Sequence, residues 1–320
     1  MTATTMDIET ASQPARGQGA AGEMIFRTLC FSAATLLMAA LAGVVVSLAI
    51  GGWPAFRQFG IGFLFSSEWN PVTEVYGAAG PIVGTIVTSI LALVIALPLA
   101  LGVSVFLVEF CPRRISRPIA IAVELLAGIP SIVYGMWGLF VLAPWFALHI
   151  QMPLLMDLDP NGLLGQLFAG IPNGANIFTA SMILAIMILP YMSAVFRELL
   201  LTIPSQVREA AYGLGSTSFE VVAQVMLPYV RRGTVGVIML GLGRALGETM
   251  AVTFIIGNSH GFPHSLFDSG STIASTIANE FAEATSDMHT SALVALGLVL
   301  FLLTFAVLAT ARALLASDKH

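Results

Sequence analysis

The sequence predicts an all-α integral membrane protein with six transmembrane helices. Hydrophobic residues make up 57% of the 320 residues and charged residues only 10%, and the mean hydropathy is +0.90. Such a composition excludes an ordinary soluble protein. Apolar stretches long enough to cross a hydrocarbon core of about 30 Å as a helix recur along the chain. The distribution of basic residues between these stretches also fits an even number of crossings.

The chain divides into a tail, a first span and a larger membrane domain. Residues 1–24 lack apolar periodicity, so we expect a disordered cytoplasmic tail. The first transmembrane helix is expected at residues 25–50, and a periplasmic or outer loop at 51–79. The other five helices form one domain over residues 80–316. Its spans are expected at about residues 81–108, 118–144, 176–196, 233–257 and 291–315, with a kink at 128–131 and a second outer loop at 145–175.

The orientation follows from the basic residues, because Lys and Arg are retained in cytoplasmic loops. Of the 13 Lys and Arg residues, all except Arg57 and Arg244 fall on one side of the six spans. Arg57 falls on the other side, and Arg244 lies inside the fifth span. We therefore predict that both termini are cytoplasmic. The residues on the cytoplasmic side are Arg16, Arg27, Arg113, Arg114, Arg117, Arg197, Arg208, Arg231, Arg232, Arg312 and Lys319.

Several kinds of site are not expected in this chain. The net charge of -5 provides no basic patch for nucleic acid. The two cysteines lack metal-ligand spacing, and the outer-loop histidines, His260, His264 and His289, are interpreted as solvated. No phosphate-binding G-x-x-x-x-G-K-[ST] loop and no catalytic cluster is found. The chain is therefore not expected to be an enzyme, to hold a metal or to bind ATP.

The cytoplasmic segment at residues 197–232 is predicted to fold into two short helices joined by a glycine turn. Ser205 is a candidate N-cap, and Gly213 or Gly215 can end the first helix in the left-handed conformation. Thr217 and Glu220 have capping-box spacing for the second helix. An apolar surface suited to docking against another protein is expected from Ala210, Ala211, Tyr212, Phe219, Val221, Val222 and Val225.

This segment resembles the E-A-A loop of the membrane subunits of bacterial ABC importers. The resemblance rests on Glu209, Ala210, Ala211 and Gly215, followed by Leu227 and Pro228; Val225 stands where the pattern usually has Ile. It implies that these six residues form a coupling element that docks into a cleft of the ATPase subunit. The alternative is an amphipathic re-entrant hairpin that packs only against its own helices.

Two ionisable residues lie in the fifth apolar stretch. Arg244 lies about 11 residues past the expected helix start, roughly 16 Å deep and near the bilayer midplane. An arginine there costs about 2.5 to 3.5 kcal/mol on insertion scales, so it is expected to face the protein interior or a water-filled path. Glu248 is its i+4 neighbour on the same helix face and can pair with it. The pair is interpreted either as an internal ion pair that locks helices together or as an anion-guiding site.

Other residues near this stretch leave alternatives open. Gly241, Gly243 and Gly247 permit either close helix packing or a narrow ion passage. Glu124, in the third span, is a weaker candidate for the substrate pathway. It is interpreted as a pore residue or as a partner of a nearby arginine, Arg113 or Arg117.

The segments at residues 124–131 and 241–252 resemble phosphate-specific permease subunits, the PstC type more than its PstA partner. This resemblance implies a MetI-like, type I ABC importer fold in the bacterial cytoplasmic (inner) membrane. It implies a second permease of the PstA type, two ATPase subunits that bind ATP and Mg, and a periplasmic or surface-tethered phosphate-binding protein. Arg244 and Glu248 match charged positions implicated in phosphate passage. The alternatives are a permease for sulfate, molybdate or phosphonate, and an ion-gradient-driven anion carrier with Glu124 and Glu248 as proton sites.

Overall fold

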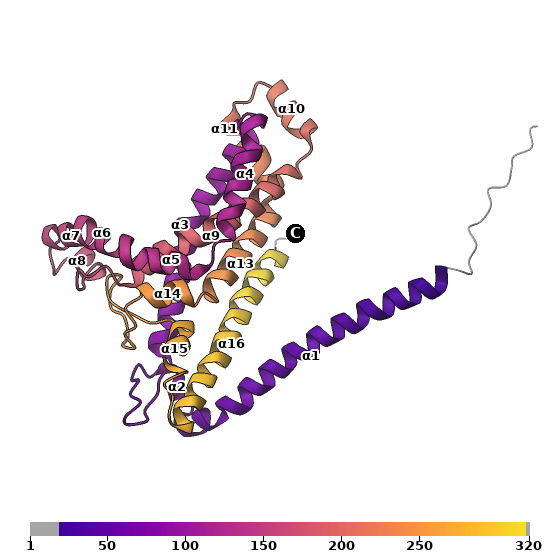
Figure 1. The fold of residues 1–320 in the computed structure, drawn as a ribbon. Helices are drawn as coiled ribbons and strands as arrows, with labels where there is room; N and C mark the ends of the chain where they lie inside the picture. Colours follow the sequence, from indigo (N-terminus) through magenta and orange to yellow (C-terminus); the bar gives the residue numbers. More distant parts are fainter. Residues whose placement is uncertain (1–18, 318–320) are drawn as a thin grey trace, which may run out of the picture. The chain divides into compact units, whose positions relative to one another are not determined.

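The computed structural model describes residues 19–317, and the expected N-terminal tail lies mostly outside this range. The chain splits into two compact units, residues 1–50 and 51–320. Every regular element in the described range is a helix, so the predicted all-α class is confirmed (Figure 1). Within residues 19–317, five helices are long and apolar enough to cross a membrane, or six if one bent pair counts as a span.

The first of these helices, α1, is longer than expected. It covers Gly19–Phe59, and an 18-residue window within Gly22–Phe59 has a mean hydropathy of 2.4. Residues 51–59, assigned above to a loop, therefore belong to the helix despite Pro54. Within the second unit, the Ser291 hydroxyl donates to the Gly51 carbonyl at 2.8 Å and accepts from the Ala55 N–H at 3.1 Å. A side chain from α16 thus satisfies backbone groups around this proline, which allows the helix to continue.

The second unit is built around α3 (Ala79–Val105), which ends in the π-helical turn η1 (Phe106–Phe110), and α9 (Ile177–Leu201). The two helices pack along each other, and both also contact α13 (Arg231–Leu246). Their contact surfaces carry small residues, including the fully buried Ala92, Ala96 and Ala100. Small side chains let helix backbones approach closely where lipid replaces water.

The third predicted span is displaced toward the C-terminus. Helix α4 (Arg113–Ala127) stops at Gly128, and Pro130 precedes α5 (Ser131–Trp137), so the expected kink is a complete break. The membrane-length helix is Ser131–Asp157 instead of residues 118–144. It continues through η2 (Gly138–Leu142), α6 (Ala143–Phe146), η3 (Ala147–Gln151) and α7 (Met152–Asp157), followed by the short α8 (Leu163–Leu167).

The fifth predicted span, residues 233–257, is not one helix. Residues 218–229 and α13 meet at a bend of 77°. A second break, at Gly247–Thr249, separates α13 from α14 (Met250–Ile255). Gly247 occupies the C-cap of α13, and glycine in a helix interior costs about 1 kcal/mol relative to alanine, which favours termination there. The last elements are α15 (Ile273–Glu280) and the long α16 (Asp287–Ser317).

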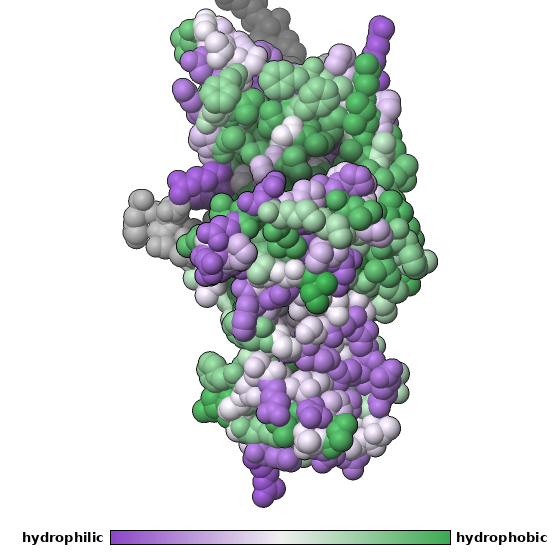
Figure 2. All heavy atoms as spheres, turned by 90° about the vertical axis from the view of Figure 1, so that its left-hand side faces the viewer, coloured by the Kyte–Doolittle hydropathy of each residue, from purple (hydrophilic) through white to green (hydrophobic). Residues whose placement is uncertain are grey.

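The surface of the chain carries many exposed large hydrophobic residues, among them Leu125, Phe140 and Phe305. Figure 2 shows wide hydrophobic areas on one face of the molecule. Such surfaces fit contact with lipid or with a partner helix, because water would not favour them. At the end of the second unit where α10 (Ser205–Gly213) lies, the chain turns through the predicted coupling segment; α2 (Gly62–Phe65) and α15 lie at the opposite end (Figure 1).

Candidate functional site

Arg244 lies in the last turn of α13, and its side chain is exposed. Its guanidinium carbon is 5.7 Å from the centre of the Tyr191 ring on α9, within the range of a cation–π interaction. Its charge also acts on the Tyr134 hydroxyl, which donates to the Leu126 carbonyl at 3.0 Å. Arg244 is therefore held by an aromatic face, which leaves its N–H groups open to a ligand.

Glu248 does not pair with Arg244, so the interpretation as an internal ion pair is wrong. Among the residues that the structure describes, no ion pair joins the two. The break at Gly247 removes the helical i,i+4 geometry, and the Glu248 Oε1 accepts the Ala251 N–H at 3.1 Å in the first turn of α14. The Glu248 carboxylate thus accepts a backbone N–H that the start of α14 would otherwise leave without a partner. Arg244 and Glu248 are close in sequence, but their side chains contact different groups.

The three glycines of this stretch differ in their surroundings. A Cβ atom at Gly241 would lie 2.6 Å from the Met192 sulfur, so Gly241 serves close packing against α9. At Gly243 the nearest atom would be 3.8 Å away, on Leu308, and Gly247 is exposed. Close helix packing therefore accounts for Gly241, whereas Gly243 and Gly247 leave space beside Arg244.

Glu124 lies on α4 and forms an ion pair with Arg197 of α9, with 3.8 Å between Oε1 and Nη1. Arg197 also contacts Glu198 at 2.7 Å. One interpretation gave Glu124 a partner in Arg113 or Arg117. The structure gives a different one, because those arginines lie about two or three turns away on the same helix, whereas α4 contacts α9. The side chain of Arg113 lies outside what the structure describes.

The predicted coupling segment, residues 197–232, folds largely as its sequence predicts. Gly215 has a φ of +89° after α10, the left-handed conformation expected at the turn. The Thr217 hydroxyl accepts the Glu220 N–H at 3.4 Å, and Glu220 accepts the Thr217 N–H at 2.7 Å, so the capping box is present. Pro204, not Ser205, precedes α10, and no side chain caps that helix; the Ser205 prediction is wrong.

The second helix of the segment runs through α11 (Ser218–Glu220), η4 (Val221–Met226) and α12 (Leu227–Tyr229). Its inner side chains form a small core with α9 and η1 that includes Ala211, Val221 and Met226. Toward solvent, Leu214 is 89% exposed and Phe219 is 77% exposed. Glu209, Ala210, Gly215 and Pro228 are also exposed, and Leu227 is half-buried. The segment therefore packs on its own helices with one side and offers an apolar surface on the other.

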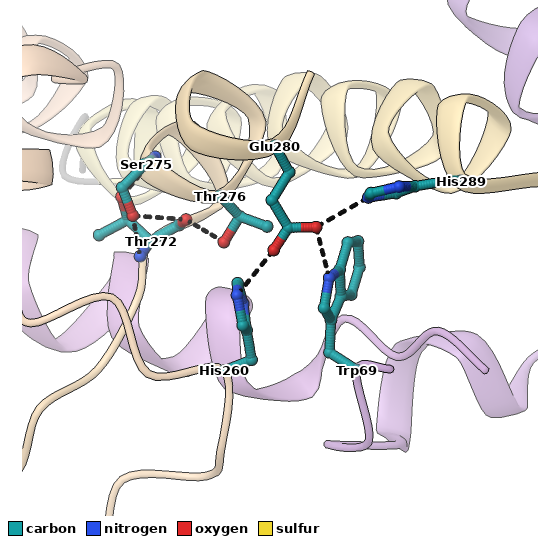
Figure 3. A network of polar contacts seen from close by, with 7 residues as sticks. All are labelled: Trp69, His260, Thr272, Ser275, Thr276, Glu280 and His289. Atoms are coloured by element: carbon teal, nitrogen blue, oxygen red, sulfur yellow. Dashed lines mark hydrogen bonds and ion pairs between the residues drawn. The ribbon is translucent and has the colours of Figure 1, made fainter. Parts of the chain in front are cut away.

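The outer loops hold a polar cluster that the sequence analysis missed (Figure 3). The Glu280 carboxylate at the end of α15 accepts the Trp69 indole N–H at 2.7 Å. The Nε2 atoms of His260 and His289 lie 2.7 and 2.8 Å from its two oxygens. His289 is only 7% exposed, so the interpretation of these two histidines as solvated is wrong. His264 is exposed, as expected.

Aromatic stacking completes the cluster. The Trp69 ring stacks on His260 with 5.6 Å between centroids, and Tyr76 stacks on His289 at 5.3 Å. Burial raises the pKa of the Glu280 carboxyl, but the hydrogen bonds from His260, Trp69 and His289 outweigh burial and lower it below the ordinary value. The cluster borders an open pocket of about 520 Å³ that Glu74 and Glu283 also line. No signal in the sequence joins these residues, because they come from three separate segments.

Comparison with known proteins places the chain among the membrane subunits of transporters. The family model described as "Binding-protein-dependent transport system inner membrane component" matches residues 96–317, and the chain belongs to this family. It is 53% identical over 295 residues to the phosphate transport system permease protein PstC of Mesorhizobium japonicum, which covers 92% of this chain and 90% of that protein. The PstC protein of Pasteurella multocida is 51% identical over 92% and 91% of the two chains.

Solved structures show the same fold. A chain of the bacterial alginate ABC transporter, in complex with an alginate pentasaccharide-bound periplasmic protein, aligns with a TM-score of 0.59 at 15% identity over 90% of this chain and 94% of that one. A chain of the MetNI methionine ABC transporter aligns with a TM-score of 0.54 at 15% identity over 75% and 95%. These neighbours confirm the predicted MetI-like architecture, and the family places the chain in the inner membrane as a multi-pass transporter subunit.

Proposed function

We propose that this chain is the PstC-type permease subunit of an ABC importer and that it moves inorganic phosphate into the cytoplasm. The identity of 53% over most of the chain to a protein named as a phosphate transport permease supports the substrate. One structural observation carries the proposal for the pathway: Arg244 is exposed on a broken membrane helix and contacts an aromatic ring instead of a carboxylate.

The chemistry of Arg244 suits a tetrahedral oxyanion. A guanidinium donates two parallel hydrogen bonds to an oxyanion, and it stays charged at any physiological pH. An arginine within a membrane span does not face lipid at acceptable cost, so the face of α13 that carries Arg244 lines a cavity toward a partner permease. Glu248, at the adjoining break, shapes that site by holding the start of α14 and by limiting how strongly an anion binds.

The proposed assembly contains partners on both sides of the membrane. A second permease of the PstA type completes the cavity, and two ATPase subunits bind ATP and Mg, since no cofactor is expected in this chain. Glu209 and Ala210, with Gly215, Leu227 and Pro228, dock into an ATPase cleft from the cytoplasmic side, where both termini lie, while Ala211 packs in the small core behind them. A phosphate-binding protein delivers the ion from the opposite side. The exposed Leu214 and Phe219 supply apolar contact area for the ATPase.

The alternatives are less well supported. A permease for sulfate, molybdate or phosphonate would use the same arginine, but the relatives at 53% and 51% identity are phosphate permeases by name. An ion-gradient-driven carrier would need free carboxylates as proton sites. Glu124 contacts Arg197, and Glu248 accepts a backbone N–H, so both carboxylates already have partners within the chain.

The test is phosphate uptake by cells that carry Arg244→Gln in an otherwise complete transporter. We expect uptake to be abolished while the ATPase still co-purifies with the chain. Glu209→Lys is expected to release the ATPase, which separates docking from the pathway. Undiminished phosphate uptake in Arg244→Gln would overturn the pathway role of Arg244. Uptake of labelled phosphate in cells without the ATPase would overturn the importer assignment.

A further inference from the structure

Glu109 joins the coupling segment to the end of α3. It lies in the π-helical turn η1, and its side chain is 10% exposed. The Arg208 Nη1 lies 3.5 Å from Glu109 Oε2, and the Tyr212 hydroxyl donates to Glu109 Oε1. Arg208 and Tyr212 stand four residues apart on α10, so they share a helix face, and they bracket residues 209–211. One carboxylate thus receives polar contacts from two residues of α10.

Apolar packing surrounds this contact. Val105 and Val108, at the end of α3 and in η1, pack against the small core that contains Ala211 and Val221. A carboxylate shielded from water at such a boundary binds its donors more strongly and more directionally than an exposed one. The inner face of α10 is therefore fixed to η1, whereas Glu209 and Ala210 on the other face remain exposed.

The opposite end of α3 is tied to the outer loops. The Thr85 hydroxyl oxygen accepts the N–H of Ile273 at 2.9 Å, where α15 begins. A Cβ atom at Gly84 would lie 2.0 Å from the Ser271 carbonyl oxygen, so only glycine permits this backbone approach. Between its two ends, α3 packs against α9 and α13. A displacement of η1 can therefore be transmitted along α3 to α13, which carries Arg244, and to the outer loops.

We infer that Glu109 is a positioning residue that transmits movement of the coupling segment to α3. This inference rests on the proposed function, because it takes α10 as the element that an ATPase moves. It adds a second route to the direct connection from α12 into α13. That direct connection bends by 77°, whereas the Glu109 contact acts sideways on a helix that runs without a break from Ala79 to Phe110.

The experiment measures coupling in the purified transporter reconstituted in liposomes with its phosphate-loaded binding protein. Phosphate uptake and ATP hydrolysis are recorded together for wild type, Tyr212→Phe and Glu109→Gln. Tyr212→Phe removes one hydroxyl, and Glu109→Gln removes the charge that holds Arg208. We expect both variants to assemble and to hydrolyse ATP, with phosphate moved per ATP lowered roughly 3- to 10-fold, the range that the loss of one typical hydrogen bond predicts. A purely structural role would lower both activities together.

Tyr229→Phe is the matched control. Tyr229 lies in the same segment, is 55% exposed, and its hydroxyl has no hydrogen-bond partner among the described residues. We expect it to keep the wild-type ratio. A wild-type ratio in Tyr212→Phe and Glu109→Gln would overturn the inference, and if Glu109→Gln does not assemble, Tyr212→Phe decides alone. Failure of the wild-type complex to import phosphate would instead overturn the proposed function, so the two failures are distinct.

Discussion

The guanidinium of Arg244 lies over the ring of Tyr191, 5.7 Å from its centre, and not beside Glu248. The two residues come from α13 and α9, which pack against each other. An aromatic face attracts a cation without using its hydrogen-bond donors. The arginine is therefore oriented while its donors stay available, which an ion pair with a carboxylate would not allow.

Removing the Tyr191 ring is expected to weaken transport. Tyr191→Leu should lower phosphate uptake roughly 2- to 30-fold, since a cation–π contact contributes about 0.5 to 1 kcal/mol at an exposed site and about 2 kcal/mol in a desolvated one. Tyr191→Phe keeps the ring and should retain most uptake. Ile186→Ala, which trims an exposed side chain of the same helix, is the control. Equal uptake in the Leu and Phe variants would show that the ring does not orient Arg244.

Gly241 is expected to be intolerant of large side chains. Gly241→Leu places atoms where the Met192 sulfur lies, and overpacking of this kind costs about 1 to 3 kcal/mol. The expected result is a lower Tm of the detergent-purified protein. Gly236→Leu is the matched control on α13, since a Cβ atom there meets nothing within 4 Å. A similar loss of Tm in both variants would contradict the packing role.

The capping box of the coupling segment is expected to stabilise its second helix locally. Thr217→Ala removes the acceptor for the Glu220 N–H, and loss of such a cap costs about 1 kcal/mol. Backbone amides of residues 220–226 should then exchange hydrogen faster. Ser205→Ala should leave the exchange of α10 unchanged, because the Ser205 side chain caps nothing. Faster exchange only in the Ser205 variant would reverse this assignment.

Acid is expected to weaken the outer cluster through Glu280. Its pKa in the folded protein is lowered from the ordinary value of 4.5 by the hydrogen bonds from His260, Trp69 and His289, which exceed the opposing effect of burial. The stabilisation is therefore complete above the pKa of the unfolded chain and is lost as the pH falls through the lower folded value. The Tm should drop over this acidic range in wild type.

Glu280→Gln is expected to lower the Tm at neutral pH. As the pH is lowered, the Tm of this variant should fall less than that of wild type. Glu283→Gln provides the control, because Glu283 lines the same pocket, is exposed and accepts no side-chain hydrogen bond within the described range. Scanning calorimetry of both variants at several pH values gives the comparison. An unchanged acid dependence in Glu280→Gln would show that another group controls it.

Local features of this protein were predictable from sequence because each depends on residues close along the chain. Apolar length predicts the membrane spans. The capping box of Thr217 and Glu220 involves residues three positions apart, and the left-handed turn requires only the missing side chain of Gly215. Helix breaks were harder to predict. Gly128 and Pro130 suggested a kink, but sequence periodicity alone did not distinguish a kink from the observed break.

The sequence by itself determined that the chain is an all-α membrane protein, that a polar segment separates two apolar stretches and that an arginine lies inside one of them, because composition and short-range spacing are sufficient for these properties. Only the tertiary structure decided which side chains meet. The Tyr191 ring contacts Arg244, and Glu109 binds Arg208 and Tyr212. Glu280 accepts a hydrogen bond from Trp69, 211 positions away in the sequence. Such contacts depend on how the helices pack and on where they break. Hydrophobic periodicity in the sequence predicts neither of these.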